Sequence, residues 1–175
     1  MRKVLYIMGQ LNDQDIEWMA RSGRRLALAP DEVIIRQGIE SPDIFIVLSG
    51  AVEVQVSGVG VVARLSTGEI IGEMSFVDKA PPSATVRASE PSIVLALDKR
   101  QMEDRLTSDT GFAARFYKAL SIYIADRLRS TMARPGGSPS GIQADELDEM
   151  VLDQVSMAGT RFQQMLKTLL SADAR

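Results

Sequence analysis

The sequence predicts a mainly β fold with flanking α-helices, because short β-rich runs fill the middle of its 175 residues and helical periods lie on both sides. Turn residues such as Ser41-Pro42-Asp43 separate the runs. Parallel strands would need crossover helices between them, so this close spacing predicts an antiparallel sandwich or roll. The expected strands are Arg25–Leu28, Glu32–Arg36, Ile44–Leu48, Val52–Val56, Val61–Leu65, Thr85–Ala88 and Ser92–Leu97.

A short helix is expected before the strands and a long one after them. Asn12 or Asp13 can cap the first helix, acidic residues suit its first turn, and Gly23 can end it. After Lys99 the apolar period becomes helical and predicts a long amphipathic helix over about residues 110–133. Its apolar stripe recurs every fourth residue and comprises Phe112, Phe116, Leu120, Ile124, Leu128 and Met132.

The C-terminal part has its own organisation. Pro135–Gly141 is rich in Pro, Gly and Ser, which is the composition of a linker. One apolar stripe follows from Leu147 to Val155 and another from Phe162 to Leu170, so we expect two helices with a break near Gly159. The sequence thus predicts a domain over residues 1–133, a linker over 134–143 and a C-terminal helical extension over 144–175.

Composition excludes several classes of function. The chain has no cysteine and no histidine, so it lacks a thiol nucleophile, a zinc–thiolate site and the commonest general base. No carboxylate pair or Ser–Lys arrangement converges by spacing, and we therefore expect neither an enzyme nor a metal site. The net charge of −3 argues against DNA binding. No apolar run reaches the roughly 18 residues that span a bilayer, so a cytoplasmic protein without membrane insertion is expected.

The stretch around residues 68–88 carries the strongest functional signal. Gly72 precedes a short helical turn, so backbone N–H groups near Met74 and Ser75 are free to bind an anion. Glu73 can accept a hydrogen bond from a hydroxyl such as that of a ribose, and Ser83 adds a hydroxyl and an N–H on the facing segment. On these residues alone, a plain turn between two strands is the alternative interpretation.

The order of these residues resembles the phosphate-binding cassette of the cyclic-nucleotide-binding domain family. That cassette has a Gly-Glu pair, a short helix and then a segment similar to Pro81–Val86. Upstream, Pro30–Gly38 and Ile44–Gly50 are similar to the early strands of the family. The resemblance covers about residues 12–133. It implies a jelly-roll-like β-roll of the catabolite activator protein kind, without its DNA-binding domain.

The resemblance also implies roles for single residues. Glu73 would bind the ribose 2′-hydroxyl, the backbone at Met74 and Ser75 together with Ser83 would hold the cyclic phosphate, and the long helix would close over the base. Arg127–Thr131 is similar to part of the matching helix in the catabolite activator protein, which implies that Thr131 meets the adenine edge and the partner subunit; a polar helix end is the alternative. The complete expected site is Gly72, Glu73, Met74, Ser75, Pro82, Ser83, Ala84 and Thr131.

Pro82 departs from the family, which has a phosphate-pairing arginine there. Losing one partner of such a charge pair costs roughly 2–5 kcal/mol, or about 30-fold to several-thousand-fold in affinity. Arg87 and Lys79 are the candidate replacements, with Lys79 the better placed unless it is a solvated loop lysine. Weak binding of a cyclic nucleotide, binding of another ligand such as a cyclic dinucleotide, and no binding all remain open. Ser83 in place of threonine favours cAMP over cGMP.

The residues after the long helix are too few and too acidic for a winged DNA-binding domain, so the expected output is association. The apolar stripe predicts a homodimer through the long helix, with packing on its own roll as the alternative. The combination of Gly72–Asp78 with Pro81–Val86, and the run Phe116–Leu120, are also similar to a bacterial subgroup associated with peptide export. We expect a regulatory module that binds a cyclic nucleotide and signals through helix movement to an unidentified protein partner. The alternative is a degenerate adaptor that binds no nucleotide.

Overall fold

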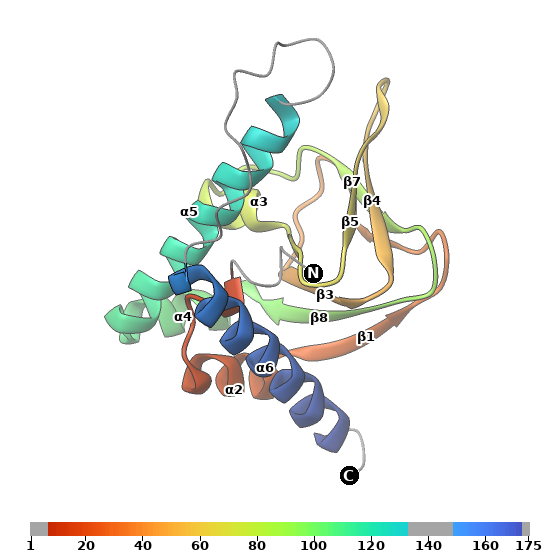
Figure 1. The fold of residues 1–175 in the computed structure, drawn as a ribbon. Helices are drawn as coiled ribbons and strands as arrows, with labels where there is room; N and C mark the ends of the chain where they lie inside the picture. The colour runs from red at the N-terminus through yellow and green to blue at the C-terminus, as the bar shows by residue number, and fades with distance from the viewer. Residues whose placement is uncertain (1–6, 133–148, 173–175) are drawn as a thin grey trace.

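The computed structural model describes residues 7–132 and 149–172, and their side chains over 7–129 and 157–169. Two four-stranded antiparallel sheets face each other, and helices cover the outer face of one of them (Figure 1). The strands are β1 (Arg24–Leu28), β2 (Val33–Ile35), β3 (Asp43–Ser49), β4 (Ala51–Val56), β5 (Gly60–Ser66), β6 (Ile70–Ile71), β7 (Thr85–Ala88) and β8 (Ser92–Asp98). The helices are α2 (Asp13–Ser22), α3 (Glu73–Val77), α4 (Lys99–Ser108), α5 (Thr110–Met132) and α6 (Glu149–Ala172).

The strand orders are β1-β8-β3-β6 in the first sheet and β2-β7-β4-β5 in the second, with every pairing antiparallel. This confirms the expected mainly β fold and all seven expected strands. The eighth strand, β6, was not expected, because two residues are too few to show a period. Helix α4 was also missed, since only Met102 and Leu106 are buried along its ten residues.

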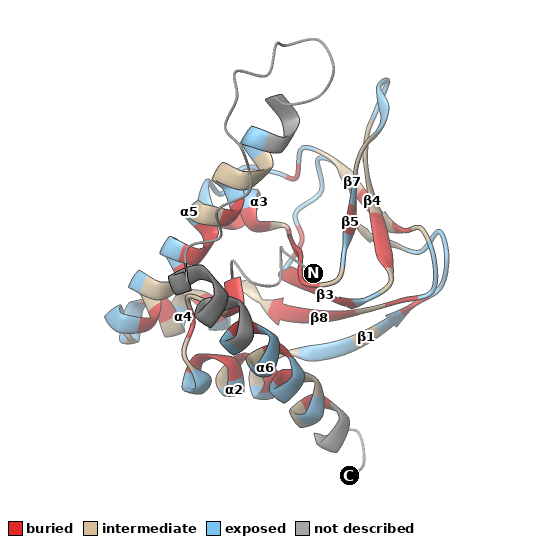
Figure 2. Ribbon diagram, viewed as in Figure 1, coloured by how far each residue is buried: buried red, intermediate tan, exposed pale blue. Residues whose placement is uncertain are grey.

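Strand β3 explains why the molecule has two apolar layers. Its alternate side chains point to opposite faces of the sheet, as pleating requires. Ile44 and Ile46 join the layer between this sheet and the helices, whereas Phe45 and Val47 join the layer between the two sheets. Figure 2 shows that most of β3 and β8 is buried, as expected of strands that are covered on both faces. The helices therefore pack against the roll through one continuous apolar layer.

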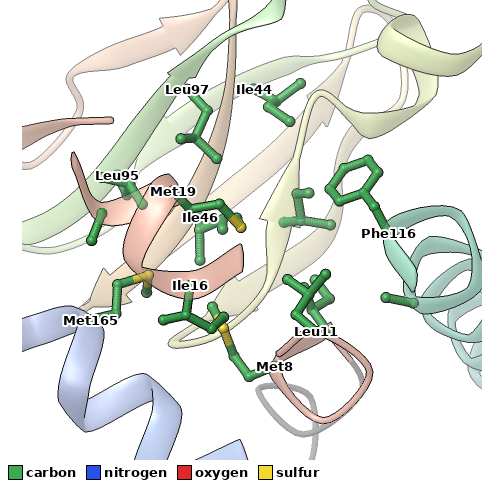
Figure 3. Packing of buried hydrophobic residues seen from close by; sticks show 14 of the residues in the cluster. Met8, Leu11, Ile16, Met19, Ile44, Ile46, Leu95, Leu97, Phe116 and Met165 are labelled. Atoms are coloured by element: carbon green, nitrogen blue, oxygen red, sulfur yellow. The ribbon is translucent and has the colours of Figure 1, made fainter. Parts of the chain in front are cut away.

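The stripe of α5 divides between two environments. Phe112, Phe116 and Leu120 are buried against the roll and α3, as the alternative interpretation of the stripe required (Figure 3 labels Phe116). In contrast, Ile124 is 40% exposed and Leu128 is 56% exposed. The upper part of the stripe is thus an open apolar surface, and the lower part belongs to the core of the same chain.

Helix α6 runs without interruption from Glu149 to Ala172, so the expected break near Gly159 is wrong. Gly159 is exposed, and a glycine inside a helix costs only about 1 kcal/mol relative to alanine. Its buried neighbours, including Phe162 and Met165, pack with α2 in the core and offset that cost (Figure 3). The expected linker over 134–143 lies outside the described residues. No helix in the described ranges is both long and apolar enough to cross a membrane.

Candidate functional site

A cavity of about 140 Å³ opens between α3, the segment 78–84, strands of the second sheet and α5. Every expected site residue except Thr131 lines it, so the fold gathers residues from both halves of the cassette around one space. Thr131 lies in α5, but its side chain is outside the described residues. The lining residues from the expected site are Gly72, Glu73, Met74, Ser75, Pro82, Ser83 and Ala84.

Gly72 turns the chain from β6 into α3. Its φ of +84° lies in the left-handed region, which residues with a side chain adopt at a cost. A Cβ at this position would also lie 3.3 Å from Cδ1 of Ile35. This turn aims the next residue, Glu73, into the cavity, where its side chain is buried.

Glu73 is 4% exposed, and Arg127 of α5 pairs with it. Nη1 of Arg127 donates to Oε1 of Glu73 at 2.8 Å. Burial raises the pKa of Glu73, and the nearby guanidinium opposes that rise without cancelling it. An ion pair therefore joins the buried carboxylate of Glu73 to the long helix.

Tyr123 supports this arrangement from one turn earlier on α5. Its buried hydroxyl donates to the carbonyl oxygen of Ile70 at 3.1 Å, and the Arg127 guanidinium lies 5.7 Å from its ring centroid. Arg127 also lines the cavity. Sequence reasoning named Arg127 only within a similar segment and missed this role. The helical spacing was the available signal, because Arg127 lies four residues after Tyr123 and seven after the buried Leu120.

The two cations considered as replacements for the arginine, Lys79 and Arg87, have charge partners outside the cavity. Lys79 pairs with Glu103 of α4 and lies 5.0 Å from the ring centroid of Phe76. Arg87 pairs with Asp31 at 2.9 Å and with Glu53 at 3.4 Å. Neither cation is among the residues that line the cavity. Glu103 holds the side chain of Lys79 outside the cavity, and Asp31 and Glu53 hold that of Arg87 outside it.

Pro82 and Ser83 form the rim opposite α3. Pro82 is buried and its carbonyl oxygen accepts a hydrogen bond from the N–H of Gly38 at 2.8 Å, which fixes the segment against the preceding loop. Ser83 is exposed, so its hydroxyl and N–H are available to a ligand in the cavity. The rim thus supplies polar groups but no positive charge.

Ser75 and Lys99 form a pair that the sequence did not predict. Nζ of Lys99 donates to Oγ of Ser75 at 3.1 Å, and that hydroxyl donates to the carbonyl oxygen of Gly72 at 3.1 Å. Burial lowers the pKa of Lys99. The spacing of residues in the sequence indicated no Ser–Lys arrangement, and this contact arises from the fold. The fold brings together two residues that are 24 positions apart in the sequence. At this separation, helix or strand periodicity does not predict a contact.

The fold and the cavity define the class: a β-roll domain with a cavity between α3, the second sheet and the long helix α5. Residues 25–109 match the family model described as "Cyclic nucleotide-binding domain". The chain therefore carries a domain of the cyclic nucleotide-binding family, which is a regulatory rather than a catalytic family.

Known proteins agree with this assignment. The chain is 31% identical to the Pycsar effector protein PaPycTIR of Pseudomonas aeruginosa over 75% of its own length and 42% of that protein. It is 33% identical to a cAMP-dependent protein kinase regulatory subunit of Yarrowia lipolytica over 54% of its own length and 25% of that protein. The chain thus spans less than half of either relative. A cyclic nucleotide-binding domain from Methylobacillus flagellatus shares the fold, with a TM-score of 0.68, 22% identity and coverage of 81% of this chain and 86% of that one.

Proposed function

We propose that the domain is a regulatory module that binds a cyclic nucleotide in this cavity and transmits binding through α5. Glu73 accepts a hydrogen bond from the ribose 2′-hydroxyl. The backbone N–H groups of Met74 and Ser75, with Ser83, hold the cyclic phosphate. The serine at position 83 favours cAMP over cGMP.

The ion pair between Glu73 and Arg127 is the observation that carries this proposal. A ribose hydroxyl needs a free lone pair on the Glu73 carboxylate, and Arg127 already occupies one of its oxygens. A ligand must share Glu73 with Arg127 or displace it. Either event changes the free energy of the upper part of α5, so ligand affinity and helix position become linked.

Pro82 makes this site weak. The family's phosphate-pairing arginine is absent, and Arg127, the cation that lines the cavity, is paired with Glu73. Losing a charge partner costs roughly 2–5 kcal/mol, so a site of micromolar affinity becomes one of about millimolar affinity. We therefore expect a sensor of high ligand concentrations.

Isothermal titration with cAMP, cGMP and cyclic di-GMP tests the proposal. We expect weak binding of cAMP by the wild type, loss of that binding in Glu73→Ala, and at least about 30-fold tighter binding in Pro82→Arg. Glu90→Ala is the matched control, because this exposed carboxylate pairs with Arg64 and does not line the cavity. A wild type that binds none of the three ligands contradicts the proposal.

A degenerate adaptor is the second candidate function. It is favoured by the same ion pair, since Arg127 satisfies the buried Glu73 without any ligand. In that case Pro82→Arg alone would bind nucleotide, and the chain would act through a fixed protein contact. The similarity to a peptide-export subgroup belongs with this candidate and stays a prediction.

The output that we propose is association. Tyr117, Ile124 and Leu128 are 46%, 40% and 56% exposed and follow one another at spacings of seven and four on α5. This is the spacing of a helix seam that packs against a second copy. We include three further points in this proposal. The chain forms a homodimer through this seam, acts on an unidentified protein partner, and is located in the cytoplasm.

A further inference from the structure

Lys99 contacts Ser75, which lines the part of the cavity that we assign to the phosphate. The backbone holds Lys99 firmly, because its N–H donates to the carbonyl oxygen of Pro42 at 2.9 Å and the preceding Asp98 caps α4. From there its side chain reaches Ser75, with Nζ 3.1 Å from Oγ. Ser75 lines the cavity and Lys99 does not, so Ser75 connects this lysine to the cavity.

Lys99 differs from the other cations around α3 in its hydrogen-bond partner, which is a hydroxyl and not a carboxylate. Lys79 pairs with Glu103, and Arg127 pairs with Glu73. Within the described residues, Lys99 forms no ion pair, and its ammonium donates to a neutral hydroxyl. Partial burial without a contacting carboxylate disfavours the charged form, and burial lowers the pKa of this lysine. An anion bound next to Ser75 would relieve that cost.

We propose that Lys99 is a positioning residue for the phosphate and supplies, through Ser75, the positive charge that the family's arginine supplies elsewhere. This inference rests on the proposed function. The Ser75 hydroxyl has one donor hydrogen, which points to the carbonyl oxygen of Gly72. A phosphate oxygen that accepts this hydrogen in place of Gly72 would lie about two hydrogen-bond lengths, or about 6 Å, from Nζ. Opposite charges at this distance still attract in a partly buried setting. The attraction is weaker than that of a directly contacting arginine.

The test compares Lys99→Met with Lys79→Met, which removes the same charge from another lysine that contacts α3 but is paired with Glu103. For cAMP we expect Lys99→Met to weaken binding about tenfold, equal to about 1.4 kcal/mol, and Lys79→Met to change it by less than about twofold. Lys99→Arg keeps most of the affinity. Adenosine has no phosphate, so its affinity stays equal in all of these variants.

Two results overturn the inference: wild-type cAMP affinity in Lys99→Met, or an equal loss for adenosine, which would indicate a structural role. Thermal unfolding checks that each variant is folded. If the wild type binds no cyclic nucleotide, the proposed function fails by itself. Lys99 is then judged by comparing Pro82→Arg with Pro82→Arg/Lys99→Met, where we expect at least about a threefold loss. Equal affinities there, or no binding by Pro82→Arg, overturn the inference as well.

Discussion

Arg127→Met tests the coupling between α5 and the cavity without any ligand. Methionine keeps the apolar stem of the side chain and removes the guanidinium that donates to Glu73 at 2.8 Å. Glu73 is almost fully buried, so its carboxylate loses its charge partner in a place that water barely reaches. Leaving a buried charged group without its partner costs about 3–5 kcal/mol. Arg127 itself is partly exposed, which lets water reach the gap, and we expect a loss of about 1–3 kcal/mol near neutral pH.

The pH dependence of this loss has a definite sign. The folded-state pKa of Glu73 already lies above its unfolded value because of burial, and removing Arg127 raises it further. A group with a raised folded pKa stabilises the fold while it is protonated, and that contribution disappears as pH rises through the folded pKa. Arg127→Met should therefore be closest to the wild type in acid and most destabilised at about pH 7 to 8.

Urea unfolding at about pH 5 and about pH 8 measures both effects. The matched control is Arg129→Met, because Arg129 is an exposed arginine two positions further along α5. Adding Glu73→Gln to Arg127→Met removes the buried charge, so it should recover most of the stability lost near neutral pH. Equal unfolding free energies for Arg127→Met and the wild type at both pH values would refute the reasoning. So would a double variant that recovers nothing.

Two further predictions concern the rest of the helical layer. Asp15 is 1% exposed and accepts two hydrogen bonds from Arg115, at 2.7 and 2.9 Å, so Asp15→Asn should lower the unfolding free energy by about 3 kcal/mol in urea titrations. Leu128→Glu places a charge on the exposed seam of α5 and should shift the mass in light scattering from dimer towards monomer, while Lys118→Glu should not.

Each of these predictions has a clear contrary result. An unfolding free energy for Asp15→Asn within error of the wild type would mean that the pair with Arg115 contributes nothing to stability. A monomeric wild type, or a Leu128→Glu variant that remains dimeric at the same concentration, would remove the α5 seam as the dimer contact.

Sequence by itself determined the local elements and the members of the cassette. The expected strand Thr85–Ala88 agrees with β7 at both ends, and Asn12 caps α2 through its hydrogen bond with Asp15. Gly72 and Glu73 line the same cavity as Ser83, as their order along the chain indicated. These features depend on turn chemistry, capping and side-chain alternation, which act over a few residues and can be read along the chain.

Only the tertiary structure decided the electrostatics of the site. Arg127 contacts Glu73, which is 54 positions away in the sequence, and Lys99 contacts Ser75, which is 24 positions away. Lys79 pairs with Glu103 and does not line the cavity. Such contacts depend on where α4 and α5 pack against the roll. The periodicity of a helix shows which face is apolar, but the packing of the whole core determines which polar side chain that face carries into a cavity.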